Sequence, residues 1–276
     1  MMIADPMDLS WIDALALFTV GAVAGALNVL AGGGSFLSLP LLIFLGLPPS
    51  VANGTNRIAI LVQNMGAVWR FRTHGLVDRS WIPLAAAPAI AGAVLGTWGA
   101  IEIGEEAFRR VLAGLMVAAT LWILWDPLAR REGRGRVAAG EWTPTAAARD
   151  GAELLASGGP RRFGLAAAFF LAGVYGGFVQ AGIGFLLAAV ATWAGLDLVR
   201  GNALKVLVVL LLTPVSLALF AWSGRVDWVM GLPLAAGHLL GALAGVRLTV
   251  LKGHVWIKRF LTVTVVAFAI KLWVAP

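Results

Sequence analysis

The chain has 276 residues, of which 60% are hydrophobic and 13% are charged, and its formal net charge is +7. These values exclude an ordinary water-soluble domain, in which about 25% of the residues are charged, and indicate a protein that is covered by lipid. The absence of cysteine excludes disulfide bonds, thiolate metal sites and a catalytic cysteine.

Five apolar stretches occupy the first part of the chain, and a polar segment separates them from five more. The first five cover residues 10–31, 35–47, 54–72, 80–101 and 107–125. Residues 126–162 are rich in Arg, Glu, Gly and Pro, which predicts a cytoplasmic linker loop. The second five cover residues 163–180, 182–195, 203–222, 229–250 and 257–274. The sequence predicts an all-α polytopic membrane protein with a first transmembrane repeat at 1–125 and a second at 163–276.

The two parts repeat each other, because adding 149 to a residue number in the first part often gives the same residue type in the second. Asn53 corresponds in this way to Asn202, and Asp78 corresponds to Asp227. The same register joins Gly33 to Gly182, Gly46 to Gly195, Gly92 to Gly241 and Arg110 to Arg259. Frequent glycines coincide by chance, but chance does not explain the polar pairs. We predict an internal duplication, which is common in transporters.

The positive-inside rule predicts opposite orientations for the two repeats. Basic residues place the junction after 54–72 and the loop at 126–162 in the cytoplasm. In the second repeat, the basic junctions are those before 203–222 and after 229–250. Equivalent junctions therefore face opposite sides. We predict two inverted-topology repeats, each with a broken or short helical hairpin plus three transmembrane helices.

The stretches at 35–47 and 182–195 are short for a membrane crossing, since a helix needs about 20 residues to span the hydrocarbon core. A glycine-rich cluster precedes each stretch, with AGGGS at 31–35 and QAGIG at 180–184. Helix breaks at membrane depth persist only where they are buried in protein or line a cavity. Helix N-termini at the breaks favour an anion, and the alternative role of the glycines is close helix packing.

A second polar cluster lies where each short stretch passes into the next helix. Residues 51–57 read VANGTNR and residues 200–206 read RGNALKV, so that Asn56 corresponds to Lys205. Asn and Lys donate hydrogen bonds that suit the oxygens of a carboxylate or a sulfonate. The alternatives are helix capping for the asparagines and snorkelling to the interface for Arg57 and Lys205.

Gln63 and Asn64 lie further along the same apolar stretch, where polar side chains are costly in lipid. We expect them to face the bundle interior, either as site lining or as interhelical hydrogen-bond partners. The residues predicted to bind substrate are Gly33, Gly34, Ser35, Asn53, Asn56, Arg57, Gln63, Gln180, Gly182, Gly184, Asn202 and Lys205.

Several of these motifs occur together and in order. They are residues 32–40, GLPP at 46–49, VANGTNR at 51–57, GIGF at 182–185 and NALK at 202–205. In this arrangement the chain resembles the sulfite exporter TauE/SafE family of membrane transporters, over nearly its whole length except the 126–162 loop. The resemblance implies movement, and specifically export, of small sulfur-containing anions such as sulfite or organosulfonates across the bacterial inner membrane.

Three classes of function come into question for such a chain: a secondary anion transporter with alternating access around a midplane site, an intramembrane enzyme, and a non-transporting membrane scaffold. An enzyme needs a nucleophile with its base or a metal cluster, and His74, His238 and His254 are scattered. A scaffold has little use for paired helix breaks. We expect a small anionic substrate and the lipid bilayer as partners, with no enzymatic activity, cofactor, metal or nucleic acid.

The coupling of transport is open at the level of sequence. No Asp or Glu lies deep inside an apolar stretch, although membrane carboxylates are the usual relays of protons and sodium ions. Asp78 and Asp227 lie at helix ends, where capping is the favoured role. His238 is a candidate for proton coupling, and the favoured alternative is a hydrogen-bonded packing residue. A channel-like or uniport mechanism for other anions such as carboxylates stays an alternative, and the oligomeric state is open.

Overall fold

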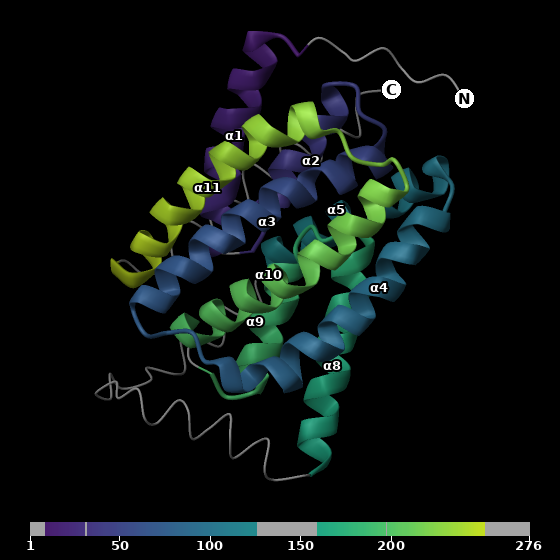
Figure 1. Cartoon of the computed structure of the whole chain (residues 1–276). Helices are drawn as coiled ribbons and strands as arrows, with labels where there is room; N and C mark the ends of the chain where they lie inside the picture. Colours follow the sequence, from purple (N-terminus) through teal and green to yellow (C-terminus); the bar gives the residue numbers. More distant parts are fainter. Residues whose placement is uncertain (1–8, 31, 126–158, 197, 252–276) are drawn as a thin grey trace.

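The computed structural model describes residues 9–30, 32–125, 159–196 and 198–251, and every regular element in these ranges is a helix (Figure 1). The first half contains α1 (Trp11–Leu30), α2 (Ser35–Phe44), α3 (Pro49–Thr73), the 3-10 turn η1 (Arg79–Trp81), the π-helical turn η2 (Ile82–Ala86), α4 (Ala87–Glu102) and α5 (Glu105–Trp125). The second half contains α8 (Pro160–Phe178), α9 (Ile183–Trp193), α10 (Leu198–Trp222) and α11 (Trp228–Leu251). The prediction of an all-helical chain is confirmed.

Length and composition make four of the described helical segments candidates for crossing a membrane. These are Trp11–Leu30, Arg79–Glu102, Val199–Trp222 and Trp228–Arg247. The helices α2 and α9 are apolar but have only 10 and 11 residues, as expected for the two short stretches. The predicted stretch at 257–274 and most of the predicted linker lie outside the described residues. Residues 160–162 of that linker already belong to α8.

Helix boundaries in the two halves are spaced like the sequence motifs. Adding 149 to the bounds of α3 gives those of α10, and adding it to the span from 79 to 102 gives the bounds of α11. Both α3 and α8 carry a proline in the first turn, where its missing N–H costs nothing. Glycines with positive φ end equivalent helices at Gly75 and Gly224 (67° and 71°).

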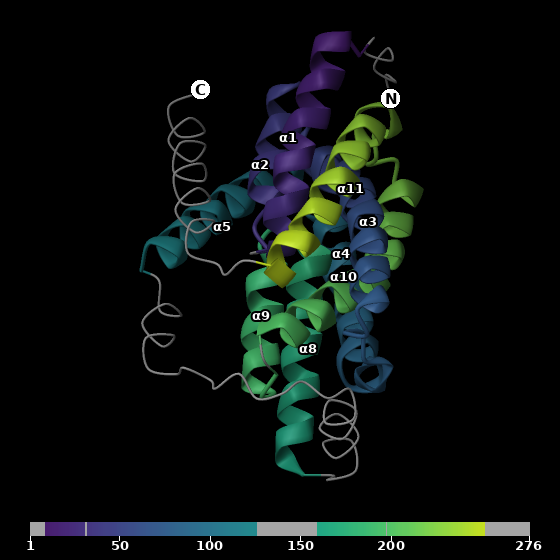
Figure 2. The same cartoon turned by 90° about the vertical axis from the view of Figure 1, so that its left-hand side faces the viewer.

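The two halves are interleaved in space. α1 starts at the top of Figure 1 and runs downward, whereas α8 starts at the bottom and runs upward, and Figure 2 shows the same directions. α1 packs along α11, and in the equivalent contact α8 packs along α4. The first helix of each half therefore packs against the helix of the other half that is equivalent in the 149-residue register, α11 or α4.

Small residues make these two helix contacts close. A Cβ at Gly241 of α11 would lie 1.8 Å from the carbonyl oxygen of Ala22 on α1. In the equivalent contact, a Cβ at Gly92 of α4 would lie 2.1 Å from the carbonyl oxygen of Phe170 on α8. Small residues let backbones approach in this way. The closer van der Waals packing matters in a membrane, because the hydrophobic effect does not drive helices together in lipid.

We expect Gly241→Ala to destabilise the protein, although alanine has a higher helix propensity than glycine. The added methyl group forces α1 and α11 apart, and overpacking of this kind costs about 1–3 kcal/mol. The measurement is the melting temperature and monodisperse yield of the purified protein in detergent. Gly114→Ala on α5 is the matched control, since a Cβ there meets nothing within 4 Å; equal melting temperatures for the two variants would contradict close packing at Gly241.

Two groups of charged residues take local partners at the ends of helices. Asp78 accepts a hydrogen bond from the backbone N–H of Ser80 (2.9 Å), and Asp227 accepts one from that of Met230 (2.8 Å). Both aspartates therefore cap the helices that follow them, as the sequence favoured.

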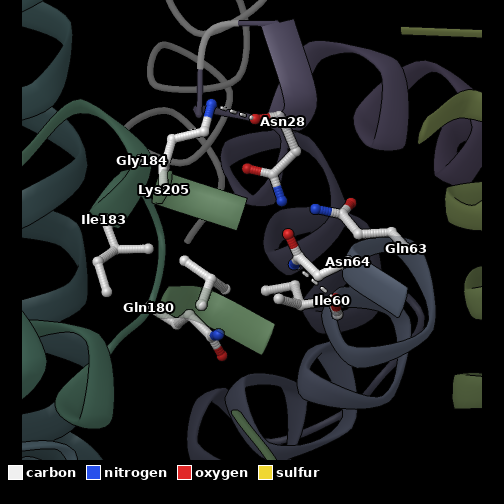
Figure 3. A pocket seen from close by; sticks show the side chains of 9 residues that line it. Asn28, Ile60, Gln63, Asn64, Gln180, Ile183, Gly184 and Lys205 are labelled. Atoms are coloured by element: carbon white, nitrogen blue, oxygen red, sulfur yellow. Dashed lines mark hydrogen bonds between the residues drawn. The ribbon is translucent and has the colours of Figure 1, made fainter. Parts of the chain in front are cut away.

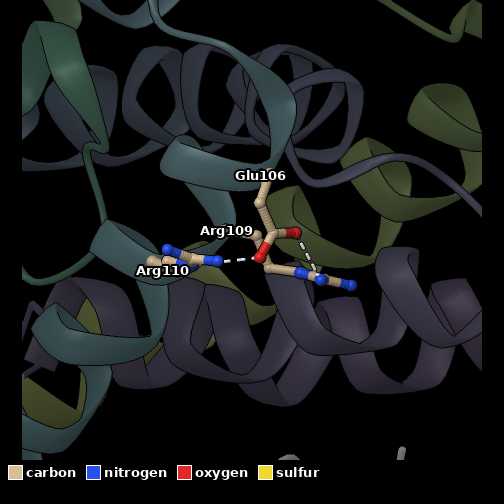
Figure 4. Close-up of polar contacts among 3 residues, drawn as sticks. All are labelled: Glu106, Arg109 and Arg110. Carbon is tan, nitrogen blue, oxygen red and sulfur yellow. Dashed lines mark hydrogen bonds and ion pairs between the residues drawn. The ribbon is translucent and has the colours of Figure 1, made fainter.

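Arg109 and Arg110 form the other group. In the predicted orientation they lie on the side opposite the cytoplasm, where the positive-inside rule does not expect basic residues. Both pair with the exposed Glu106 on the first turns of α5, and the Nε atom of Arg110 lies 3.0 Å from its carboxylate (Figure 4). The pairing offsets part of their charge, so these two residues carry little weight in an assignment of membrane orientation.

Candidate functional site

The two glycine-rich helix breaks meet inside the bundle. The first lies between the end of α1 at Leu30 and the start of α2 at Ser35, and the second lies between α8 and α9. A Cβ at Gly32 would lie 2.5 Å from the Cα of Gly184, and one at Gly184 would lie 2.3 Å from the Cα of Gly32. The backbones thus touch at this point, and φ of +90° at Gly32 is a second reason why glycine is needed there. Both predicted roles of the glycines, a helix break and close packing, are present in one contact.

A small pocket lies beside this contact and is lined by both halves. It has a cavity volume of about 10 Å³, which is room for about one water molecule. Its lining residues are Asn28, Ile60, Gln63, Asn64, Gln180, Ile183, Gly184, Lys205 and Val209. Ile60 and Val209 are 149 residues apart, so the two halves contribute equivalent positions to one pocket.

Lys205 supplies the positive charge of the pocket from the second turn of α10. Its side chain is buried, and its Nζ donates to the carbonyl oxygens of Val29 (2.9 Å) and Asn28 (3.3 Å). These carbonyls belong to the last turn of α1, where carbonyl groups lack partners within the helix and a cation is favoured by the helix dipole. An ammonium group has three N–H donors, so these two contacts leave one donor. Snorkelling of Lys205 to the interface is excluded by its burial.

Three amide side chains line the pocket together with Lys205 and lie close to one another. Figure 3 shows the amide groups of Asn28, Gln63 and Asn64 turned toward one another. The Nδ2 atom of Asn64 donates to the carbonyl oxygen of Ile60 within α3 (2.7 Å). No acidic residue lines the pocket, and the buried polar residues of the described chain include no Asp or Glu. The pocket therefore combines one cation with neutral donors and acceptors, which suits a small anion.

Arg57 has a different position from the one predicted. Its guanidinium is completely buried and donates to the carbonyl oxygens of Gly176 (3.1 Å) and Gly177 (2.6 Å), in the last turn of α8. It also donates to Oε1 of Gln180 (3.0 Å) and lies over the ring of Phe220, 4.6 Å from its centroid. Arg57 does not line the pocket, and the alternative of snorkelling is wrong because the side chain has no exposed surface.

The two buried cations therefore occupy related positions. Arg57 on α3 of the first half completes the end of α8, and Lys205 on α10 of the second half completes the end of α1. Each broken helix ends on a cation that the other half supplies. Burying a charge is costly unless it is hydrogen-bonded, and the open carbonyls of a helix end meet that need.

Other predicted residues form contacts next to the pocket. Asn56 on α3 donates to the hydroxyl of Ser35 (3.1 Å) and accepts from that of Ser38 (2.6 Å). Asn53 donates to the carbonyl oxygen of Phe178, at the end of α8 (2.8 Å). The N-cap of α3 is Pro48, so the alternative of an N-cap role for Asn53 is wrong.

The structure thus brings part of the predicted set together. Gln63, Gln180, Gly184 and Lys205 line the pocket. The predicted residues that do not line it are Gly33, Gly34, Ser35, Asn53, Asn56, Arg57, Gly182 and Asn202. Asn28 was missed, although a polar residue close to the end of an apolar stretch and just before a glycine break is a recognisable pattern.

Comparisons with known proteins give a consistent result. The model of the sulfite exporter TauE/SafE family matches residues 17–272. The chain is 30% identical to a "Probable membrane transporter protein" of Haemophilus influenzae, with 90% of this chain and 89% of the relative covered. It is 28% identical to the "Probable membrane transporter protein YfcA" of Escherichia coli K12, with 93% and 88% covered, and 27% identical to "Probable membrane transporter protein ORF9" of Sinorhizobium sp, with 94% and 92% covered. No solved structure matches the chain.

Proposed function

Because the chain belongs to the sulfite exporter TauE/SafE family, we propose that it is a secondary transporter that exports small sulfur-containing anions, sulfite or organosulfonates. The family is one of membrane transporters, and the apolar helices are those of a multi-pass membrane protein. We place the protein in the bacterial inner membrane, with the basic junctions in the cytoplasm.

One observation carries the choice of an anion as substrate. Lys205 is a buried cation at a pocket between the two helix breaks, and no carboxylate of the described residues lines that pocket. An anion that enters the pocket pairs with this charge in a desolvated place, where electrostatic attraction is stronger than in water. Gln63 and Asn28 add amide groups that can donate to its oxygens.

The proposed mechanism is alternating access through two inverted repeats. Three features support it: helix boundaries that follow a 149-residue register, opposite directions of α1 and α8 in Figure 1, and a pocket lined by equivalent positions of both halves. Rocking of one half against the other around a fixed site is the usual motion of such repeats. A pocket with room for about one water molecule is narrower than a sulfite ion, so this conformation corresponds to a closed state.

The second candidate is a channel-like or uniport permease for small anions, carboxylates included. It is favoured by the lack of buried Asp and Glu in the described part of the chain, because buried carboxylates are the usual relays for a driving ion. The two candidates differ in whether a proton gradient drives net movement.

The test is anion binding followed by transport. Purified protein is titrated with sulfite, sulfoacetate, thiosulfate and acetate while its melting temperature is followed, since a ligand that binds only the folded state raises it. Each binding anion is then tested for uptake into proteoliposomes with and without a proton gradient. Stabilisation and uptake of a sulfur oxyanion is the expected result, and uptake that ignores the gradient favours uniport. No binding by any of the four anions would overturn the proposal and favour a scaffold role.

A further inference from the structure

His238 on α11 lies next to the pocket and does not line it. Its side chain has no exposed surface, and its Nδ1 atom lies 2.7 Å from Oε1 of Gln63, which does line the pocket. The other ring nitrogen, Nε2, is buried and has no hydrogen-bond partner among the described residues. The ring therefore makes one hydrogen bond, and that bond is to a pocket residue.

The chemistry of this contact fixes the direction of the Gln63 side chain. A carbonyl oxygen only accepts, so the ring donates from Nδ1. A buried N–H without an acceptor is costly, which favours the tautomer with the proton on Nδ1 and the lone pair on Nε2. With Oε1 held by His238, the NH₂ group of Gln63 is the end of the amide that is left for the pocket.

The internal duplication shows that the fold does not need a polar contact here. In the 149-residue register Gln63 corresponds to Leu212, and His238 corresponds to Ala89. Leu212 and Ala89 are both completely buried and belong to one apolar cluster. Apolar residues thus occupy both equivalent positions, so packing alone does not account for the His238–Gln63 pair.

We propose that His238 is a positioning residue that fixes the Gln63 amide with its NH₂ donor turned toward the anion. This inference rests on the anion site of the proposed function. Lys205 supplies the charge, and the oriented amide adds a directed hydrogen bond to one anion oxygen. His238 itself does not touch the anion. An amide free to rotate would present its carbonyl oxygen part of the time, and that oxygen repels an anion.

The test is a double-mutant cycle on anion affinity. His238→Leu removes the donor, and His238→Asn keeps one, because the amide nitrogen of Asn takes a place close to that of Nδ1. Both substitutions are made in the wild-type protein and in the Gln63→Leu variant. Each purified protein is titrated with sulfite and with sulfoacetate while its melting temperature is measured. We expect His238→Leu to weaken apparent affinity about tenfold, the lower end of the range for one hydrogen bond to a charged group, because the Gln63 amide is still present. His238→Asn should stay within about threefold of the wild type, and His238→Leu should have no further effect in Gln63→Leu.

Each outcome decides the matter. An equal loss from His238→Leu with and without Gln63, or equal affinities of His238→Leu and His238→Asn, overturns the positioning role. The melting temperature without anion separates a packing defect from a binding defect, since a packing defect lowers it in both backgrounds. If neither anion stabilises the wild type, the proposed function fails together with this inference. If an anion binds but the effects of the His238 and Gln63 substitutions are independent, this inference alone is wrong.

Discussion

Lys205→Met is expected to weaken anion binding and transport strongly in a protein that still folds. Methionine keeps the length and most of the volume of the side chain but removes the one charge that the described residues bring to the lining of the pocket. A hydrogen bond to a charged group contributes about 1.5–3 kcal/mol, so we expect affinity for the transported anion to fall by about 10- to 150-fold. The measurement is the anion-dependent shift in melting temperature, together with uptake into proteoliposomes.

The variant Lys205→Gln separates the two roles of this residue. The ammonium group also donates to the carbonyl oxygens of Asn28 and Val29, so part of any effect comes from the end of α1. Glutamine keeps a donor for these carbonyls without the charge, and we expect it to restore the melting temperature and not the anion binding. Arg110→Met is the control for a lost surface cation, since Arg110 is exposed and paired with Glu106. Wild-type affinity in Lys205→Met would place the anion elsewhere.

Arg57→Met is expected to have the largest effect on stability. The change leaves three buried acceptors, on Gly176, Gly177 and Gln180, without the guanidinium that holds them. Each unsatisfied buried group costs about 1–3 kcal/mol, and relief from burying the charge offsets only part of this. A loss of about 3 kcal/mol lowers the melting temperature by roughly 10 °C, and little monodisperse protein should be recovered.

Two further variants show whether Arg57 acts as predicted here or as a binding residue. Arg57→Lys keeps a cation that reaches fewer acceptors, so it should recover part of the stability and bind anions normally. Arg161→Met is the matched control, because Arg161 also donates to carbonyls at a helix end, Trp193 and Ala194, but at the surface. A stable Arg57→Met protein that has lost anion binding would instead indicate that Arg57 is a binding residue.

The fold was largely predictable because it depends on patterns that are local in sequence. Apolar length separated the short helices α2 and α9 from the longer ones, and the 149-residue register matched the helix boundaries. The start of α3 was placed too late, at 54 instead of Pro49. The polar residues at 50–56 obscured the helix, because Ser50, Asn53 and Asn56 form hydrogen bonds with other segments, and the length of an apolar stretch does not indicate such bonds.

The site was predictable only in part, because its geometry depends on contacts between the halves. Sequence reasoning named Lys205 and Gln63 but treated Arg57 as their equal. Their surroundings separate the roles of the two cations. Arg57 contacts three acceptors and an aromatic ring, whereas Lys205 contacts two acceptors and lines the pocket. The pairing of His238 with Gln63 joins residues 175 positions apart, and no local pattern predicts it.

The reciprocal caps on the broken helices also set an order for biogenesis. The carbonyl oxygen of Val29 accepts its hydrogen bond from Lys205, which lies 176 residues further along the chain. At about 5–20 residues per second, the ribosome finishes α1 many seconds before Lys205 is made. During that interval the end of α1 must be kept from lipid by water or by the insertion machinery. Closure of the bundle is therefore a late event that follows insertion of the second half.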